Sequence, residues 1–187
     1  YGSNEKLPFL EKDKTDMPIS LYAATKKSNE VFTHYYSHLY NIPTTVFRFF
    51  TVYGPWGRPD MALFKFTKKI LADEVIEIYN HGNMKRDFTY IDDLTLCIFK
   101  LINRPPELVK KNKLISDSIS NVAPWRTVNI GNNNPINLMD FIIEIEKNLN
   151  KKAKKLFVDM QPGDVSKTWS DNNLLKELID FVPNTSI

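Results

Sequence analysis

Tyr22 and Lys26 are the residues whose types and spacing point most directly to chemistry. Four residues apart on a helix, a phenol and an ammonium lie on one face. A free phenol titrates near pKa ~10, so it is a poor base at neutral pH unless a nearby positive charge favours the phenolate. Lys26 can supply that charge, and the pair then forms a tyrosine proton shuttle. The alternative is a half-buried aromatic beside an ordinary solvated lysine, because this spacing is common.

Two arginines in loops are candidates for binding an anion. Arg58 follows a glycine and Arg86 lies in the stretch Met-Lys-Arg-Asp-Phe. A planar guanidinium can bind a phosphate or a carboxylate through paired hydrogen bonds. Each arginine has an alternative partner close in sequence, Asp60 for Arg58 and Asp87 for Arg86.

Asp164 and Tyr79 could recognise the remaining parts of a nucleotide. Asp164 follows a Pro-Gly turn, where its carboxylate could accept hydrogen bonds from the two vicinal hydroxyls of a ribose. Tyr79 could stack on a base. The alternatives are a plain turn aspartate and an aromatic that merely packs, and the residues alone leave both open.

The sequence does not predict a metal site or a catalytic nucleophile. His34 and His38 have a spacing that would suit zinc if a third ligand arrived, but His81 lies in a separate turn, so we expect surface histidines and no metal site. No G-x-S-x-G motif is present. Cys97 lies in an apolar stretch, which predicts an inert core thiol.

The composition is that of a soluble globular protein with a real core, since 42% of the 187 residues are hydrophobic and 25% are charged. The net charge of +3 is too small to argue for a nucleic-acid partner. A single cysteine cannot form an internal disulfide, which favours a reducing cytoplasm. No apolar run approaches ~18 residues, so we expect no membrane span.

The alternation of helix-type and strand-type patterns predicts an α/β fold. The expected helices are residues 20–40 with Ser20 as N-cap, 62–71, 94–102 capped by Asp92, 138–149 capped by Asn137, and 174–181. The expected strands are residues 44–50, 76–79, 127–130 and 156–160. Two glycines and two prolines make residues 51–60 an irregular loop, and residues 103–126 are a Pro, Lys and Ser rich linker.

Five blocks occur in an order that resembles one known family. They are Tyr-Ala-Ala-Thr-Lys at 22–26, Arg-Phe-Phe-Thr-Val-Tyr-Gly-Pro-Trp-Gly-Arg-Pro-Asp-Met-Ala at 48–62, Lys-Arg-Asp-Phe-Thr-Tyr-Ile-Asp-Asp at 85–93, Val-Asn-Ile-Gly at 128–131 and Gln-Pro-Gly-Asp-Val at 161–165. The chain resembles the NAD-dependent epimerase/dehydratase branch of the extended short-chain dehydrogenases, and within it most closely the UDP-glucuronate 4-epimerases. The match covers nearly the whole chain.

The resemblance implies the C-terminal part of a Rossmann-type parallel sheet plus a smaller α/β substrate-binding region. Residues 1–55 would be the remainder of the dinucleotide-binding domain. Residues 56–187 would mainly bind the nucleotide sugar, with some segments returning to the Rossmann half. The chain starts at Tyr1 without an initiator methionine and lacks the family's glycine-rich NAD loop. We therefore expect a piece of a longer protein that shows no epimerase turnover by itself.

The activity implied is 4-epimerisation of a UDP-sugar with NAD as cofactor, from UDP-glucuronate to UDP-galacturonate through a 4-keto intermediate. By this resemblance Tyr22 is the base and Lys26 holds the nicotinamide ribose. Arg86 matches the arginine on the UDP diphosphate, Asp164 lies where an acidic residue meets the uridine ribose, and Tyr79 falls in the strand that packs on uracil.

Two departures from the wider family favour an acidic sugar. Thr51 stands where many members have asparagine, and its small hydroxyl leaves room for a C5 carboxylate. Arg58 adds positive potential nearby. Gln161 replaces an arginine that precedes Pro-Gly-Asp in galactose-type epimerases, so the diphosphate would depend more heavily on Arg86.

Other outcomes stay open on the same scaffold. The enzyme could be a nucleotide-sugar decarboxylase or dehydratase, or the chain could be a non-catalytic UDP-sugar-binding or assembly module. Family members commonly dimerise through the helix that carries the tyrosine and lysine. We therefore expect a homodimer through the Tyr22/Lys26 helix, which carries the aromatic residues Phe32, Tyr35, Tyr36 and Tyr40.

Overall fold

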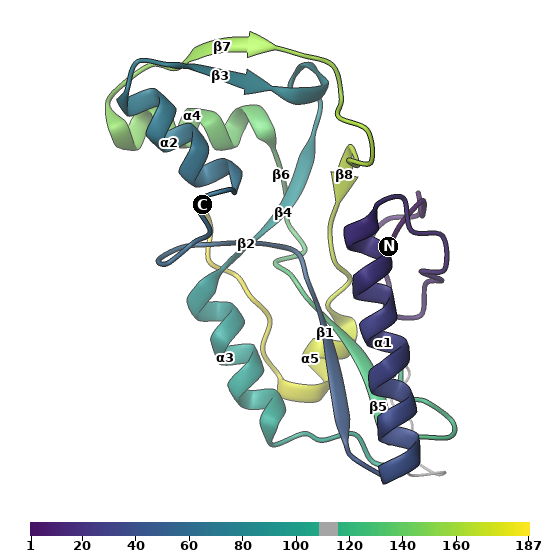
Figure 1. Cartoon of the computed structure of the whole chain (residues 1–187). Helices are drawn as coiled ribbons and strands as arrows, with labels where there is room; N and C mark the ends of the chain where they lie inside the picture. The colour runs from purple at the N-terminus through teal and green to yellow at the C-terminus, as the bar shows by residue number, and fades with distance from the viewer. Residues whose placement is uncertain (109–115) are drawn as a thin grey trace.

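The computed structural model describes residues 1–108 and 116–187 (Figure 1). Its helices are α1 (Leu21–Tyr40), α2 (Ala62–Leu71), the 3-10 turn η1 (Tyr79–Gly82), α3 (Ile91–Ile102), α4 (Leu138–Leu149) and α5 (Asn173–Ile179). Its strands are β1 (Thr44–Phe49), β2 (Thr51–Tyr53), β3 (Val75–Ile78), β4 (Lys85–Tyr90), β5 (Trp125–Ile130), β6 (Pro135–Asn137), β7 (Lys154–Phe157) and β8 (Lys167–Thr168).

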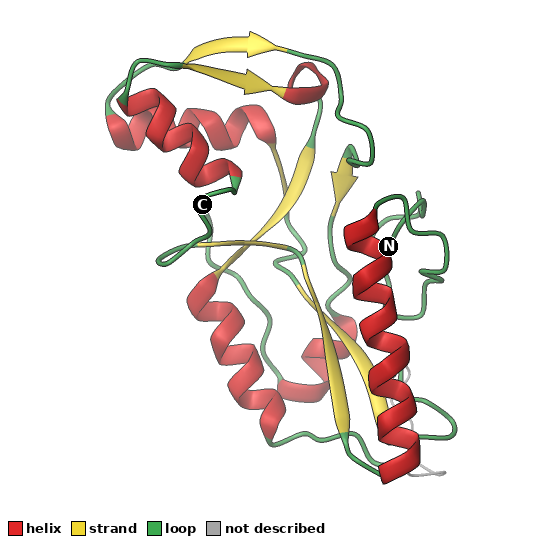
Figure 2. Ribbon diagram, in the orientation of Figure 1, coloured by secondary structure: helices red, strands yellow, loops and turns green. Residues whose placement is uncertain are grey.

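Most strand pairs are parallel, which confirms the predicted α/β class with parallel sheets. β1 pairs with β5, β2 with β4, β3 with β7 and β4 with β8 in parallel, and only β6 runs antiparallel to β4 among the named pairs of the described residues. Parallel pairs need long crossovers, and helices supply them in Figure 2. Because β1 and β2 are nearly continuous, the chain passes from one sheet to the next at Phe50.

Two hydrophobic cores lie at opposite ends of the described structure. One packs α3 and α5 on the β1–β5 pair, with Cys97, Val128 and Leu174 fully buried. The other packs α2 and α4 on β3 and β4, around Ile76 and Phe141. Helix α1 lies on the other side of the β1–β5 pair from α3 (Figure 1). The largest part of the lining of the cavity beside Tyr22 and Lys26 comes from α1, β1 and the N-terminal segment.

The start of α1 is as predicted. The Ser20 hydroxyl accepts a hydrogen bond from the Ala23 amide at 3.1 Å, which fixes the first turn directly before Tyr22. The predicted cap of α3 is wrong, and that of α4 is right in position only. Asp92 lies inside the first turn of α3, so it is not the N-cap residue. Its negative charge interacts favourably with the helix dipole there. Asn137 occupies the N-cap position of α4, but its side chain donates to Asp140 at 2.8 Å and makes no cap bond.

Several boundaries differ from the prediction because strand pairing is not local. Residues 51–53 form β2, paired with Phe88–Tyr90, so the irregular loop begins only at Gly54. Strand β7 starts at Lys154, earlier than expected, because it pairs with β3 from Val75 onward. The expected linker 103–126 loses its last two residues to β5, and its residues 109–115 lie outside the described part. None of the described helices combines the length and hydropathy that a membrane span requires.

Candidate active site

A cavity of about 660 Å³ lies between α1, β1, the N-terminal segment and the region of β8. Four of the predicted site residues line it: Tyr22, Lys26, Thr51 and Arg86. They come from α1, β2 and β4, so the fold brings together residues up to 64 positions apart in sequence.

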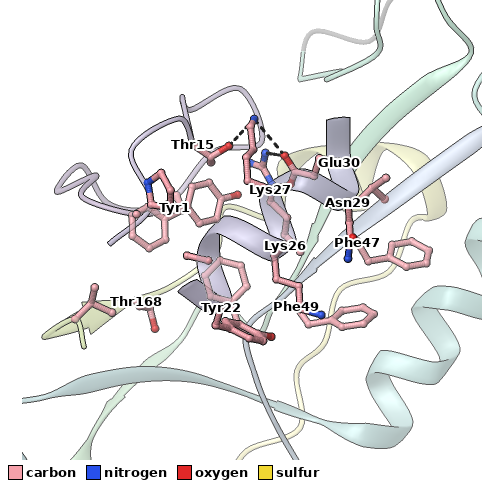
Figure 3. Close-up of a pocket in the computed structure, with 18 of the residues that line it drawn as sticks. Tyr1, Thr15, Tyr22, Lys26, Lys27, Asn29, Glu30, Phe47, Phe49 and Thr168 are labelled. Carbon is pink, nitrogen blue, oxygen red and sulfur yellow. Dashed lines mark hydrogen bonds and ion pairs between the residues drawn. The ribbon is translucent and has the colours of Figure 1, made fainter. Parts of the chain in front are cut away.

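Tyr22 and Lys26 are neighbours on the cavity side of α1 (Figure 3). The Lys26 ammonium lies 5.2 Å from the centroid of the Tyr22 ring. Tyr22 is 66% exposed, so it is not the half-buried aromatic of the alternative interpretation. Among the described residues, neither the phenol oxygen nor the ammonium has a hydrogen-bond or ion-pair partner. Both groups are therefore available to a ligand in the cavity.

Arg86 reaches the cavity from β4 and is held by the turn that precedes β8. Its guanidinium donates to Asp164 at 2.9 Å and to the carbonyls of Lys85 and Ser166 at 3.1 and 3.3 Å. Burial lowers the pKa of Arg86, and the charge of Asp164 opposes that shift. The predicted diphosphate-binding and ribose-binding residues thus contact each other directly.

Asp87 is not the partner of Arg86, and that alternative is wrong. Side chains alternate along a strand, so neighbours on β4 point to opposite faces. The Asp87 carboxylate is fully buried and accepts hydrogen bonds from the amides of Asn132, Asn133 and Ser170, at 2.7, 3.0 and 2.9 Å. It joins β4 to the loop after β5 and to the segment before α5.

Asp164 itself does not line the cavity, although its neighbour Val165 does. The turn that presents it closes with an Asp164 amide bond to the Gln161 carbonyl at 3.2 Å. Gly163 has φ +81°, a conformation that favours glycine, and a Cβ there would stand 3.2 Å from the Ile19 carbonyl oxygen. The turn therefore lies against the residue that precedes the cap of α1.

Arg58 and Tyr79 lie outside the cavity lining. The Arg58 Nε donates to Asp60 at 3.0 Å, so the predicted alternative partner is the one observed. This hydrogen bond raises the pKa of Arg58, and Tyr22 adds a smaller contribution, so the guanidinium lies within electrostatic reach of the phenol. Tyr79 begins η1 at the end of β3, and its hydroxyl donates to Glu77 at 3.1 Å.

Sequence reasoning missed a polar cluster on the cavity wall. Arg48 on β1 forms a two-pronged ion pair with Glu30 on α1, at 2.7 and 3.0 Å. Burial alone would raise the pKa of Glu30, but the hydrogen bond and charge of Arg48 outweigh it and the pKa is lowered. The spacing held a signal, because Glu30 follows Lys26 by four residues and shares its face.

Two more titratable groups adjoin this cluster. The Arg48 guanidinium lies over the Tyr1 ring, with its central carbon 4.9 Å from the ring centroid. Burial raises the pKa of the Tyr1 phenol to about 12. Glu11 accepts a hydrogen bond from the Asn129 amide at 3.0 Å, and burial raises its pKa to about 7.

The histidines and the cysteine considered in the sequence analysis have ordinary structural surroundings. His34 pairs with the Ser120 hydroxyl at 2.8 Å and His38 with the Val122 carbonyl at 2.7 Å. The described residues contain no group of three or more metal-ligating side chains. Cys97 is a buried free thiol, which confirms its predicted place in the core, and burial raises its pKa to about 12.

Residues 1–116, more than half of the chain, match the model of the NAD dependent epimerase/dehydratase family. The chain belongs to this family. It is 55% identical over its full length to "Protein CapI" of Staphylococcus aureus and covers 56% of that protein. It is 50% identical to a "Probable UDP-glucuronate 4-epimerase" of Rhizobium meliloti (strain 1021), again over its full length and 55% of the relative.

The fold also matches a solved structure of the family. A crystal structure of UDP-glucuronic acid 4-epimerase from Bacillus cereus, in complex with UDP-glucuronic acid and NAD, superposes with a TM-score of 0.80. The two are 33% identical, and the match covers 98% of this chain and 54% of the other. The chain thus spans about half the length of the relatives that it matches.

Proposed function

We propose that the protein containing this chain is an NAD-dependent UDP-glucuronate 4-epimerase, which converts UDP-glucuronate to UDP-galacturonate through a 4-keto sugar. The observation that carries the proposal is the exposed Tyr22 phenol beside the Lys26 ammonium on the wall of a cavity that Arg86 also lines. The named function of the Rhizobium meliloti relative and the ligands of the Bacillus cereus structure support the same substrate.

In this proposal Tyr22 exchanges a proton with the sugar 4-hydroxyl. The Lys26 ammonium, with three donors and no partner among the described residues, binds the hydroxyls of the nicotinamide ribose. The free donors on this wall fit a dinucleotide ribose. NAD, when bound, would accept and return the hydride at C4. The remaining task of these residues is to hold the sugar oxygen within reach of the phenol.

The other side chains would bind the nucleotide and the acidic sugar. Arg86 would bind the diphosphate, and its pair Asp164 would bind the uridine ribose, so their mutual 2.9 Å contact already aligns two parts of one ligand site. Thr51 on the cavity wall would donate to the C5 carboxylate. Arg58 would add positive potential near Tyr22 while paired with Asp60.

Tyr79 would pack on the uracil, although in this structure it lies outside the cavity lining and is bonded to Glu77. Contact with the base would therefore extend the site from the cavity toward the end of β3.

The proposed domain division places residues 1–55 in the dinucleotide-binding half and most of residues 56–187 in the sugar-binding region. The two cores support it, because β5 and α5 pack with α3 on β1, as segments that return to the first half would do.

A homodimer through α1 is also proposed. The helix exposes large apolar side chains on the side away from the sheet, among them Phe32 at 63%. The single cysteine, buried and free, suits the proposed cytoplasmic location.

The test is to incubate the full-length gene product containing this chain with UDP-glucuronate and to identify the product by mass and NMR. Epimerisation leaves the mass unchanged, whereas a decarboxylase releases carbon dioxide and a dehydratase releases water. No conversion at all by a protein with NAD bound would contradict the proposal. The 187-residue chain alone is expected to show no turnover, and turnover by it would overturn that expectation.

A further inference from the structure

Helix α1 is attached to the sheet largely by polar contacts. Among its residues, all of which the structure describes, only Glu30 and Ser37 are buried. Its large apolar side chains, including Leu21, Phe32 and Leu39, are exposed. A helix that buries an apolar stripe is positioned by packing, but this one lacks such a stripe on its sheet side. Within the described structure, the orientation of α1 on the β1–β5 pair therefore depends on a few directional bonds.

The Glu30–Arg48 pair is the strongest of these bonds. Two parallel contacts, from Arg48 Nε to Glu30 Oε1 and from Arg48 Nη2 to Glu30 Oε2, form the fork geometry that fixes both distance and angle. Both side chains are largely buried, at 13% and 11% exposure, so solvent screens the pair little. A single charge-to-charge contact at the surface would not restrict rotation of the helix in this way.

Arg48 also contacts the N-terminal segment, which forms another part of the cavity wall. Its Nη1 donates to the Glu11 carbonyl at 3.2 Å, and its guanidinium covers the Tyr1 ring. On the helix side, Lys27 extends the cluster through Thr15 at 2.9 Å and Asp16 at 3.3 Å. Figure 3 shows Lys27 reaching toward Thr15 and Glu30 on the cavity wall. One guanidinium thus joins α1, β1 and the N-terminal segment.

The pair lies in line with the proposed catalytic side chains. Tyr22, Lys26 and Glu30 are spaced four residues apart, so they follow one face of α1. At 1.5 Å per residue, Glu30 lies about 12 Å along the helix from Tyr22. Among the described residues, several side chains of α1 lie near the sheet. Of those that form a hydrogen bond to a strand, Glu30 is the nearest to Tyr22 along the helix. A rotation of α1 that moved Glu30 off its fork would move the phenol with it.

We propose that Glu30 and Arg48 are positioning residues, which hold the rotation of α1 so that Tyr22 and Lys26 face the cavity at a fixed distance from the sugar. This inference rests on the proposed function, because it concerns the geometry of the same site. Both residues line the cavity, and the role proposed for them is to hold α1 rather than to react with the sugar. Their effect is on how often the phenol occupies its productive position, which governs turnover rather than the affinity for the sugar.

The sharpest variant is the double substitution Glu30→Met with Arg48→Leu in the full-length gene product. Apolar side chains of similar volume often replace a buried ion pair without loss of stability, so this variant should fold while losing the fork. Its kcat should fall roughly 10- to 100-fold with KM for UDP-glucuronate changed less than about 3-fold, as for a misplacement of order 1 Å. Arg48→Lys, which keeps the charge but loses the fork, should give a smaller loss in the same direction.

The matched control is Glu146→Gln on α4. Glu146 is a buried carboxylate paired with Lys152 at 3.0 Å and also with Lys155, but it does not line the cavity. This variant should lower Tm and leave kcat within about 2-fold of the parent, because stability is lost away from the site. If kcat falls in proportion to Tm in both the double variant and Glu146→Gln, the Glu30–Arg48 pair has a purely structural role and the proposal is overturned.

A second readout is independent of turnover. With Tyr22 replaced by 3-fluorotyrosine, the ¹⁹F resonance should be single in the parent, shifted or split in the double variant and unchanged in Glu146→Gln. A folded double variant that retains both the parent kcat and the parent resonance would overturn the proposal. Absence of turnover by the parent would contradict the proposed function instead, and the resonance would still decide whether Glu30 and Arg48 position Tyr22.

Discussion

Glu11 makes the stability of this chain depend on pH near neutrality. Its side chain is 6% exposed, and its carboxylate accepts one hydrogen bond, from the Asn129 amide. Burial raises its pKa from the ordinary 4.5 to about 7, and the Asn129 bond opposes the shift only in part. The folded protein therefore holds a proton on Glu11 at pH values where the unfolded chain has lost it.

The sign follows from proton linkage. Because the folded pKa is the higher one, the contribution of Glu11 is fully present below about pH 4.5 and is lost as the pH rises through about 7. A pKa difference of about 2.5 at ~1.4 kcal/mol per pKa unit gives an upper limit of roughly 3.5 kcal/mol. Another buried carboxylate, Glu146, does not titrate between pH 4.5 and 7 and so does not add to this pH dependence. Burial would raise its pKa, but Lys155, Lys152 and the Ala153 amide lower it to about 2.

The assay is urea unfolding of the chain and of Glu11→Gln at several pH values between 5 and 8. The parent should lose about 2 to 3 kcal/mol of unfolding free energy across this range, and the variant should lose much less, because its amide does not titrate. Equal pH dependence in the two proteins would refute the reasoning.

Three further predictions concern other parts of the chain. In the full-length gene product, Arg86→Gln should raise KM for UDP-glucuronate about 10- to 100-fold through loss of a charged hydrogen bond, and Arg58→Gln should raise it less; equal effects in steady-state kinetics would contradict the assignment. Gly163→Ala should lower the unfolding free energy by at least about 1 kcal/mol in urea unfolding, because its φ is +81° and the Ile19 carbonyl is close; an unchanged midpoint would argue against that turn. Cys97 should react with a thiol reagent only after urea unfolds the chain, since burial holds its thiol protonated; rapid labelling of the folded chain would contradict this.

Local signals in the sequence identified most helices and part of the site. The Ser20 cap and the i,i+4 spacing place Tyr22 and Lys26 correctly because both depend on neighbours within one helical turn. The ordered blocks identified the family, which the comparison confirmed over residues 1–116.

Features that depend on distant pairing were missed. Strands β6 and β8 are three and two residues long, and only their pairing with β4 defines them. Asp87 was an alternative partner for Arg86 because the two are neighbours in sequence, whereas the alternation of β4 turns Asp87 toward Ser170. The Glu30–Arg48 pair joins residues 18 positions apart across two elements, so no local pattern could give its geometry.

The central claim is that the Tyr22 phenol exchanges the proton in a 4-epimerisation of UDP-glucuronate. The direct measurement compares the full-length gene product with its Tyr22→Phe variant, following UDP-glucuronate to UDP-galacturonate by NMR with the amount of bound NAD measured in both. We predict conversion by the parent and a kcat about 10²- to 10⁴-fold lower in the variant, with NAD still bound. A Tyr22→Phe variant that epimerises the sugar at the parent rate would contradict the account.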